Sequence, residues 1–334
     1  MKYKSLMGVF AVTLLSVSPV RAWHNQGHMM TAAVAWENMT PGAVCRAELL
    51  LNRNGEYLRG LQNPGNIRAA EAQFVNAATW PDRIKAQGSG FRGDGDDADA
   101  VGENARLNVG LDDHLMHKYW HFIDYAIPAD GSRMPPTVNA VERVNLFLSV
   151  IADQNSSDDL KAYDLAWLIH LVGDLHQPLH TTAQYGRVFG GGSDAGGNAV
   201  MVKASGAEEL HGFWDAAPGD SRNGGKVLSI SIAAARALPA PDPQLANVRD
   251  PAAWSRESYD LAARYEFAAP VTMNSKGPFT LTDGYIGDAQ RIAKLQVALG
   301  GIRLASLLNK TLTWPAPACA AGGRSVRHRR SRLS

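Results

Sequence analysis

HLVGDLHQPLH, residues 170–180, combines metal-capable side chains with the end of a long helical pattern. His170 and Asp174 are four residues apart, so both side chains project from one face of a helix. Pro178 favours an end to that helix, and His180 follows directly after it. Imidazole nitrogens and carboxylate oxygens are donors that zinc accepts. This stretch therefore predicts a long helix that ends beside candidate metal ligands.

A second pair with the same spacing, His211 and Asp215, lies further along the chain. One His-x-x-x-Asp pair alone is more often a solvated or hydrogen-bonded pair than a metal site. Two such pairs with His180 between them supply five donors and favour a metal centre. Two more segments, Trp80-Pro81-Asp82 and His121-Phe122-Ile123-Asp124, put a metal-capable residue beside a bulky apolar one. Taken alone, these two are a helix-terminal turn with a capping acid and a core histidine.

Helical spacing of apolar residues recurs over most of the chain, and strand-like alternation is rare. The segments expected to be helical are 27–39, 43–52, 66–79, 137–152, 158–176, 252–267 and 282–308. A small strand is expected at 200–202. Glycine-rich segments at 87–110 and 184–197 break the pattern as long loops. No linker separates two cores, so we expect an all-α fold, a single-domain multi-helix bundle with long loops.

The body of the chain is acidic. Residues 23–320 carry 25 basic and 32 acidic side chains, whereas the first 22 and the last 14 residues carry no acid. This balance excludes a broad basic surface as the means of holding a polyanion, so phosphate would be held locally by metal ions or a few cations. The 45% hydrophobic content excludes a mainly disordered protein. Two cysteines exclude a disulfide-rich scaffold and a cysteine-only zinc site.

The N-terminus has the layout of a secretory signal peptide. A short basic region precedes apolar residues 6–20, and Val20-Arg21-Ala22 offers a small-residue cleavage site. The alternative, a membrane anchor, is disfavoured because the apolar run is shorter than the roughly 20 residues of a span. Cleavage after Ala22 would make Trp23 the first residue of an exported protein, secreted or periplasmic. In such a protein Cys45 and Cys319 can form a disulfide, although the sequence does not show that they meet.

In this order the motifs resemble the S1/P1 nuclease family, zinc-dependent single-strand nucleases that share a superfamily with bacterial zinc phospholipase C. The pieces that carry the resemblance are Trp23 with His28, Trp80-Pro81-Asp82, His121-Phe122-Ile123-Asp124, residues 170–180, Asp194-Ala195-Gly196-Gly197-Asn198 and Leu210-His211-Gly212-Phe213-Trp214-Asp215. The C-terminal part fits in helical character without a motif. Pro81 differs from the small residue expected there. With two cysteines rather than the several of fungal members, the chain resembles a bacterial-type member.

The resemblance implies a bundle of the phospholipase C/P1 nuclease type, with long loops around a trinuclear zinc cleft. A signal peptide at 1–22 would precede a catalytic domain at 23–315, and an Arg-rich, disordered tail at 316–334 would follow. The implied zinc ligands are Asp82, His121, His170 and Asp174 for one ion; Trp23, His28 and the bridging Asp174 for a second; and His180, His211 and Asp215 for the third.

Trp23 would bind zinc through its free amino group and its carbonyl oxygen. A retained signal peptide would turn that amine into a peptide nitrogen, which is a poor ligand. We therefore expect unprocessed protein to lack one metal ion and most of its activity.

The implied activity is endonucleolytic hydrolysis of single-stranded DNA and RNA to 5′-phosphate products. Water held between the two closer zinc ions would attack phosphorus, and the third ion would stabilise the departing 3′ oxygen. The implied catalytic residues are Asp82, Lys85 and Asp174. Lys85 would stabilise charge on the phosphoryl oxygens; its alternative is a lysine on a surface helix. Whether 3′-mononucleotides are also substrates stays open.

A base-binding site beside the zinc ions is also implied. Phe122 would stack on a base and Asp124 would hydrogen-bond the base edge, while Asn198 is a further substrate-binding candidate. The alternatives are a core aromatic residue and a turn-forming aspartate. Because such contacts need an unstacked base, they favour single strands.

Two other functions are weighed against the nuclease. A zinc phospholipase C-like phosphodiesterase would apply the same chemistry to lipid headgroups, but those enzymes place Glu at the position of Asp215. A secreted helical zinc-binding or adhesion protein without catalysis would not need the complete ligand set. We expect a monomer with no membrane anchor after processing, acting on single-stranded nucleic acids and nucleotides.

Overall fold

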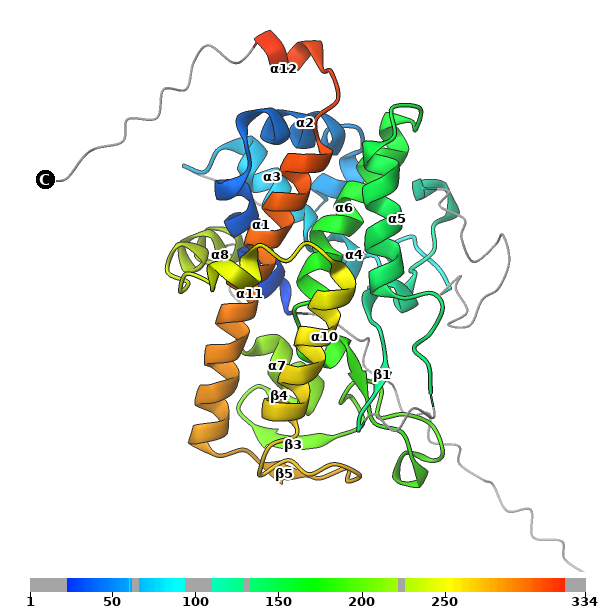
Figure 1. The fold of residues 1–334 in the computed structure, drawn as a ribbon, viewed down its shortest axis with the longest axis vertical. Helices are drawn as coiled ribbons and strands as arrows, with labels where there is room; N and C mark the ends of the chain where they lie inside the picture. Colours follow the sequence, from blue (N-terminus) through cyan, green and yellow to red (C-terminus); the bar gives the residue numbers. More distant parts are fainter. Residues whose placement is uncertain are drawn as a thin grey trace, which may run out of the picture.

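Helices form most of the protein (Figure 1). The computed structural model describes residues 23–59, 61, 66–93, 110–128, 133–221 and 226–321; the predicted signal peptide, residues 94–109 and residues 322–334 lie outside the described residues. The described α-helices are α1 (Asn25–Asn38), α2 (Pro41–Leu51), α3 (Ala69–Ala77), α4 (Trp80–Arg83), α5 (Ala140–Ala152), α6 (Asp158–Asp174), α7 (Leu210–Ala216), α8 (Val227–Arg236), α9 (Pro243–Ala246), α10 (Pro251–Leu261), α11 (Asp283–Thr311) and α12 (Pro317–Ala321). The predicted all-α, single-domain bundle is confirmed.

Helix α6 is the buried axis of the bundle. Its N-cap Ser157 accepts a hydrogen bond from the amide of Leu160 at 3.2 Å, and Asp158 and Asp159 occupy its first turn, where acidic groups complement the helix dipole. Every residue from Lys161 to Asp174 is buried, as expected of a helix surrounded by others. Helices α1 to α5 and α11 contact it. The metal-capable end of α6 therefore lies inside the core.

Helices α1 and α11 pack closely against each other. Helix α11 has 29 residues and runs along much of the molecule in Figure 1. A Cβ atom at Gly301 of α11 would lie 2.4 Å from Val34 Cβ and 2.7 Å from the Thr31 carbonyl oxygen, both on α1. The missing side chain thus permits a close approach of the two helices. This contact fixes the position of α1, which carries His28.

Two small sheets complete the fold. The strands are β1 (Tyr125–Ala126), β2 (Thr182–Ala183), β3 (Met201–Ala204), β4 (Ala207–Glu209) and β5 (Phe279–Thr280). Strand β3 lies between antiparallel β4 and parallel β5, at the end of the molecule opposite α12 (Figure 1). Strands β1 and β2 pair in parallel. This second pairing joins the segment after His121 to the segment after His180.

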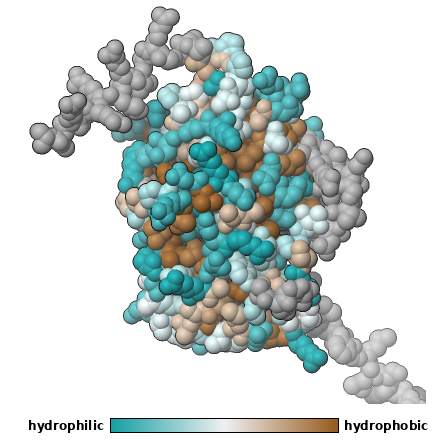
Figure 2. All heavy atoms as spheres, viewed as in Figure 1, coloured by the Kyte–Doolittle hydropathy of each residue, from teal (hydrophilic) through white to brown (hydrophobic). Residues whose placement is uncertain are grey.

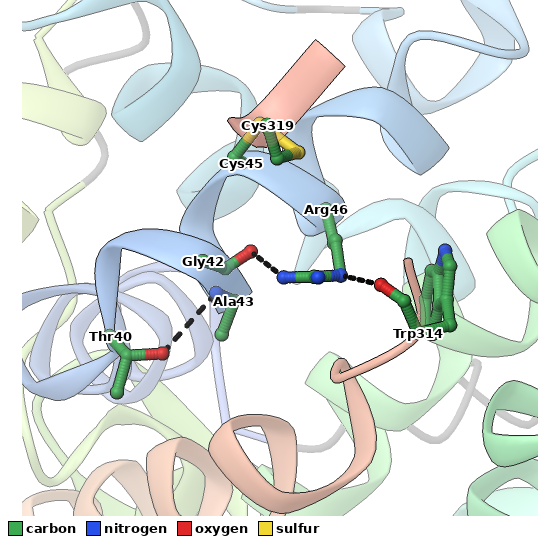
Figure 3. The surroundings of a disulfide bond; sticks show 7 residues. All are labelled: Thr40, Gly42, Ala43, Cys45, Arg46, Trp314 and Cys319. Carbon is green, nitrogen blue, oxygen red and sulfur yellow. Dashed lines mark hydrogen bonds between the residues drawn. A yellow bond between two sulfur atoms is a disulfide. The ribbon is translucent and has the colours of Figure 1, made fainter. Parts of the chain in front are cut away.

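The two cysteines form a disulfide between α2 and α12 (Figure 3). Cys45 and Cys319 have their Cα atoms 5.7 Å apart. Arg46 adds a second link near it, because its guanidinium donates hydrogen bonds to the carbonyl oxygens of Gly42 and Trp314. Residues 317–321, placed in the Arg-rich tail by the sequence, are thus helical and covalently tied to α2.

Several predicted boundaries shift for local reasons. The helix predicted from residue 137 begins at Ala140, because the Asn139 side chain accepts a hydrogen bond from the amide of Glu142 at 3.1 Å and so caps it. The helix predicted over 252–267 is α-helical to Leu261 and continues as a π-helical turn. The strand predicted at 200–202 is β3. Helices α4, α7, α8, α9 and α12 and the other strands fall outside the predicted elements.

The face drawn in Figure 2 mixes hydrophilic and apolar side chains, with the apolar ones in patches over its middle. In the described part of the chain, no helix is both long enough and apolar enough to span a bilayer.

We predict that Gly301→Ala lowers the free energy of unfolding by about 2 kcal/mol, because the added methyl group overpacks the contact between α11 and α1. Gly287→Ala, on the same helix, is the matched control: its Cβ would have nothing within 4 Å. This control should raise stability by about 0.5–1 kcal/mol through helix propensity. Urea denaturation of both variants tests the prediction, and equal effects would contradict it.

Candidate metal centre

Eight of the predicted ligand side chains converge from six elements. They are His28 from α1, Asp82 from α4, His121 from a 3-10 turn (Lys118–His121), His170 and Asp174 from α6, His180 from a second 3-10 turn (Pro178–His180), and His211 and Asp215 from α7. All eight are buried. They fall into three groups, in each of which the candidate ligand atoms lie within 4.8 Å of one another: His28, Asp82 and His170; His121, His170 and Asp174; His180, His211 and Asp215.

Asp174 belongs to the second group and also contacts the first, with which the second shares His170. Its Oδ1 lies 3.3 Å from His28 Nε2, and its Oδ2 lies 3.0 Å from His121 Nδ1 and 3.3 Å from His170 Nε2. Asp82 Oδ1 approaches His170 Nε2 at 3.8 Å. Donors about 2.1 Å from a tetrahedral zinc are separated by about 3.4 Å, so these spacings suit a metal ion. One carboxylate facing three imidazoles is also the arrangement that a bridging ligand needs.

The third group is built around α7. His211 Nε2 lies 3.5 Å from Asp215 Oδ2, and the His180 and His211 ring centroids are 5.0 Å apart. Gln177 donates from Nε2 to Asp215 Oδ1 at 2.7 Å and accepts from the amide of Leu179 at 2.6 Å. Gln177 thus orients both the carboxylate and the turn that carries His180. Residue spacing does not predict this role, although Gln177 lies within residues 170–180.

Backbone carbonyl groups set the orientation of three histidines. The Nδ1 atoms of His170, His180 and His211 donate to the carbonyl oxygens of Ala78, His121 and Gly196 at 2.7, 2.7 and 2.6 Å. Each bond leaves Nε2 as the atom available to a metal ion. Such an outer hydrogen bond is the usual way to fix the tautomer of a metal-binding histidine.

Burial keeps three of the histidines neutral. It lowers the pKa values of His28, His121 and His180 well below the usual range, and neighbouring histidines add to the effect. A neutral imidazole has a free lone pair, which metal binding requires. Among the described residues, the Nε2 atoms of His121 and His180 have no hydrogen-bond partner. These features fit a metal ligand better than a structural histidine.

The buried carboxylates also fit a cation. Burial raises the pKa of Asp174 to about 6, against the opposing effect of His170, and raises the pKa of Asp215 well above its usual range. Burial acts in the same direction on Asp82, but Lys85 and then His170 outweigh it and hold the Asp82 pKa below its usual range. A buried carboxylate is costly unless it is paired or coordinates a metal. The residues present therefore fit divalent metal ions.

Trp23 lies at the edge of the same centre. Its side chain is buried, and its Cδ1 lies 3.8 Å from the position of a Cβ on Gly173 of α6. The amide of the next residue, His24, donates to the Asp215 carbonyl oxygen at 3.1 Å. The backbone of Trp23 is thus held between α6 and α7. Zinc binding by its amino group stays a prediction, because residue 22 and those before it lie outside the described part.

Lys85 reaches the first group. Its Nζ lies 2.6 Å from Asp82 Oδ1, and its side chain is 3% exposed. The surface-lysine alternative therefore does not describe it. The Lys85 side chain is thus buried beside Asp82, and its action on a phosphoryl group stays a prediction.

Two of the three predicted substrate-binding residues share a pocket of about 250 Å³. Phe122 and Asp124 line it together with His211. Tyr119, whose ring lies edge-on to Phe122 at 5.7 Å, also lines it and was not predicted. Asn198 is not among the lining residues; its Nδ2 donates to the Ala195 carbonyl oxygen at 2.7 Å.

The pKa of the Asp124 carboxyl group is shifted in this pocket. Burial raises its pKa to about 7, and the neighbouring carboxylate of Asp194 adds to the effect. The side chain therefore changes charge near neutral pH.

A helical bundle with three buried His/Asp groups, two of which share His170 and meet at the Asp174 carboxylate, has the architecture of a multinuclear metalloprotein. Residues 23–313 match the family model described as S1/P1 Nuclease. The chain therefore belongs to the S1/P1 nuclease family, as its motifs predict.

Curated relatives agree with this assignment at low identity. Endonuclease 4 of Arabidopsis thaliana is 30% identical over 186 residues, which are 50% of this chain and 57% of the relative. Nuclease S1 of Aspergillus oryzae is 24% identical over 228 residues, 68% of this chain and 64% of the relative. Endonuclease 5 of Arabidopsis thaliana is 32% identical over 165 residues, which are 44% of this chain and 50% of the relative. The chain thus spans less than two thirds of each relative.

We predict that Gly173→Ala lowers the bound metal content by about one ion per chain. A Cβ at Gly173 would lie 2.8 Å from His28 Nδ1, so the imidazole must move away from Asp174. Metal analysis of zinc-saturated protein, with circular dichroism to check the helix content, is the measurement. Gly287→Ala is the control and should keep the wild-type content. A folded Gly173→Ala variant with the full zinc content would refute this reading of the contact.

Proposed function

We propose that this chain is a zinc-dependent endonuclease that hydrolyses phosphodiester bonds of single-stranded DNA and RNA and leaves 5′-phosphate ends. The observation that carries the proposal is the Asp174 carboxylate, which faces three buried histidines. Membership of the S1/P1 nuclease family supports the same activity. The signal peptide predicted at 1–22 supports secretion or a periplasmic location.

Three zinc ions are the proposed cofactors. Their proposed ligands are Asp82, His121, His170 and Asp174; Trp23, His28 and Asp174; and His180, His211 and Asp215. When bound, zinc supplies Lewis-acid catalysis: it polarises a phosphoryl oxygen and makes water nucleophilic at neutral pH. The buried side chains of these residues orient the substrate phosphate and exclude bulk solvent from it.

The proposed catalytic residues around the phosphate are Asp82, Lys85 and Asp174. Asp174, a member of the second group, contacts His28 of the first group and His170 of both, so it fixes their separation. Asp82 stays anionic because Lys85 holds its pKa low. Lys85 in turn brings a positive charge to the phosphoryl oxygens, where negative charge increases during the reaction. The body of the chain has a net negative charge, which repels an anionic substrate. Divalent ions bound at these groups would offset that charge locally.

The pocket beside the third group supports a nucleobase as the specificity element. Its volume of about 250 Å³ suits one base, with Phe122 as the stacking surface and Asp124 as the polar group. A base in a duplex is stacked and paired, so it reaches such a pocket only after unpairing. This favours single strands, and it also permits 3′-mononucleotides as substrates of a monomeric enzyme.

A phospholipase C-like activity is the second candidate, and the residue at position 215 disfavours it, because Asp215 stands where phospholipases of this type carry Glu. The pair of Phe122 and Asp124 in the pocket also fits a base better than a choline headgroup. A non-catalytic zinc-binding protein is the third candidate, and the complete ligand set disfavours it.

We predict that mature protein beginning at Trp23 releases 5′-phosphorylated products from a single-stranded DNA oligonucleotide. Chelator treatment should abolish the release and added zinc should restore it. Asp174→Asn should lower kcat/KM by about 10³-fold, because it removes the carboxylate that faces His28, His121 and His170. Asp153→Asn, a change of an exposed acid, should leave the rate unchanged. End-labelled substrates and a phosphatase assay of the product ends provide the measurement.

Other outcomes of this assay assign the alternatives. Turnover of a phosphorylcholine ester without cleavage of nucleic acid would indicate the phospholipase. Bound zinc with no turnover of any phosphoester would indicate the non-catalytic protein.

We predict that base preference changes with pH through Asp124. A carboxylate accepts two hydrogen bonds from guanine N1–H and N2–H, whereas a neutral carboxyl group pairs with adenine N1 and N6–H. The guanine-to-adenine ratio of kcat/KM should therefore rise about tenfold between pH 5 and pH 8, since about 1.4 kcal/mol of discrimination is tenfold. A cation bound at His211 would lower the pKa of Asp124, so the midpoint of the pH-dependent change in base ratio would lie below pH 7. Competition between two labelled oligonucleotides in one reaction removes pH effects common to both.

Asp124→Asn is the matched control for this prediction, because the amide does not titrate. Its base ratio should be flat over the same pH range. An equal slope in the wild type and the variant would contradict the role of Asp124.

A further inference from the structure

A second cavity borders the metal centre at a different group from the base pocket. It has a volume of about 360 Å³ and is lined by α4, the turn after it and the first residue of α1. Asp82 lies in its wall, so the cavity adjoins the group formed by His28, Asp82 and His170. The base pocket instead touches His211 of the third group. The two hollows therefore adjoin different parts of one metal centre.

Arg83 gives this cavity a half-buried positive charge. Its Nη1 donates to the Asn76 carbonyl oxygen at 3.2 Å and to the Thr79 hydroxyl group. Its Nε and Nη2 atoms are buried and have no acceptor among the described residues. The carboxylates of Glu56 and Asp82 also line the cavity and act on Arg83 through space, but no carboxylate of the described residues forms an ion pair with it. A guanidinium stays protonated in proteins, so two buried donors of a cation are open to an anionic ligand.

A second cation and an aromatic surface complete the wall. Arg59 lines the cavity, with its side chain 60% exposed, donating to the Ser89 carbonyl oxygen at 3.3 Å and pairing with Glu56. Phe91 is half-buried and packs edge-on against Trp80 with ring centroids 5.9 Å apart. The wall thus combines arginine, which suits phosphate geometry, with an aromatic surface that suits a sugar or base.

We infer that this cavity binds the nucleotide that follows the cleaved bond, with Arg83 and Arg59 recognising its phosphodiester anion. The inference rests on the proposed function. In that function the nucleoside that releases its 3′ oxygen lies at the third group, beside Phe122. The chain beyond the cleaved phosphate then leaves from the group that contains Asp82. That part of the strand therefore passes the cavity that Asp82 lines.

The test uses three thymidine trimers. In each trimer, the measured quantity is kcat/KM for cleavage of one chosen phosphodiester, called the cleaved bond. The first trimer has two phosphodiesters, the second has a neutral methylphosphonate after the cleaved bond, and the third has the methylphosphonate before it. In the wild type, the neutral linkage after the cleaved bond should lower kcat/KM about tenfold. In Arg83→Gln this penalty should fall below about threefold. The ratio cancels any general loss of activity, so a merely structural role of Arg83 would not change it.

Arg59→Gln provides an independent variant at an exposed position, and its penalty should fall in the same direction if Arg83→Gln does not fold. Arg53→Gln is the matched control, because Arg53 is also exposed and ion-paired, to Asp159, and does not line the cavity. It should keep the tenfold penalty. The methylphosphonate before the cleaved bond should have the same effect in all four proteins.

The outcomes separate this subsite from the proposed function. Normal cleavage with an unchanged penalty in both Arg83→Gln and Arg59→Gln would overturn the subsite alone. Failure of zinc-loaded, folded wild type to cleave any trimer would overturn the proposed function and the subsite with it.

Discussion

The contact of one buried carboxylate, Asp174, with three histidines is the interaction on which the rest of the structure depends. The imidazoles come from α1, from α6 and from the 3-10 turn that ends at His121. Burial favours the neutral form of this carboxyl group and raises its pKa to about 6, against the opposing effect of His170. A cation in the same space favours the charged form. Metal binding and the stability of this part of the core are therefore linked.

The packing of the bundle determines the geometry of that contact. Gly301 lets α11 approach α1 closely. This contact fixes the position of α1, and with it the position of His28 beside α6. The β1–β2 pairing and the His180 bond to the His121 carbonyl oxygen hold two turns together that are remote in sequence. These contacts join ligand-bearing segments through backbone atoms. Small shifts of helices would thus change the donor spacing directly, because packed cores accommodate little deformation.

The sequence predicts the long helices and part of the site, because both depend on local spacing. His170 with Asp174 and His211 with Asp215 each share one helical face, and this is readable from residue intervals. His28, Asp82 and His121 join them only through tertiary packing, so their assignment needed the family resemblance.

Other features leave no signal in the sequence that spacing alone can detect. Strands β1 and β2 have two residues each, too few for a periodic pattern. The role of Gln177 depends on Asp215, which lies 38 residues away. Asn198 was predicted from a motif, but its amide closes a local turn with Ala195 and it does not line the base pocket.

The distribution of charge determines how such a protein can act on a polyanion. The body of the chain carries more acidic than basic side chains, so its long-range field does not attract nucleic acid. At physiological ionic strength that field is screened within about 8 Å, and attraction must come from groups close to the phosphate. Lys85 at the metal centre and Arg59 and Arg83 beside it are the cations that the fold places there. In the proposed function, recognition by these few cations and by the pocket at Phe122 would favour a flexible single strand, because a duplex keeps its bases stacked and paired.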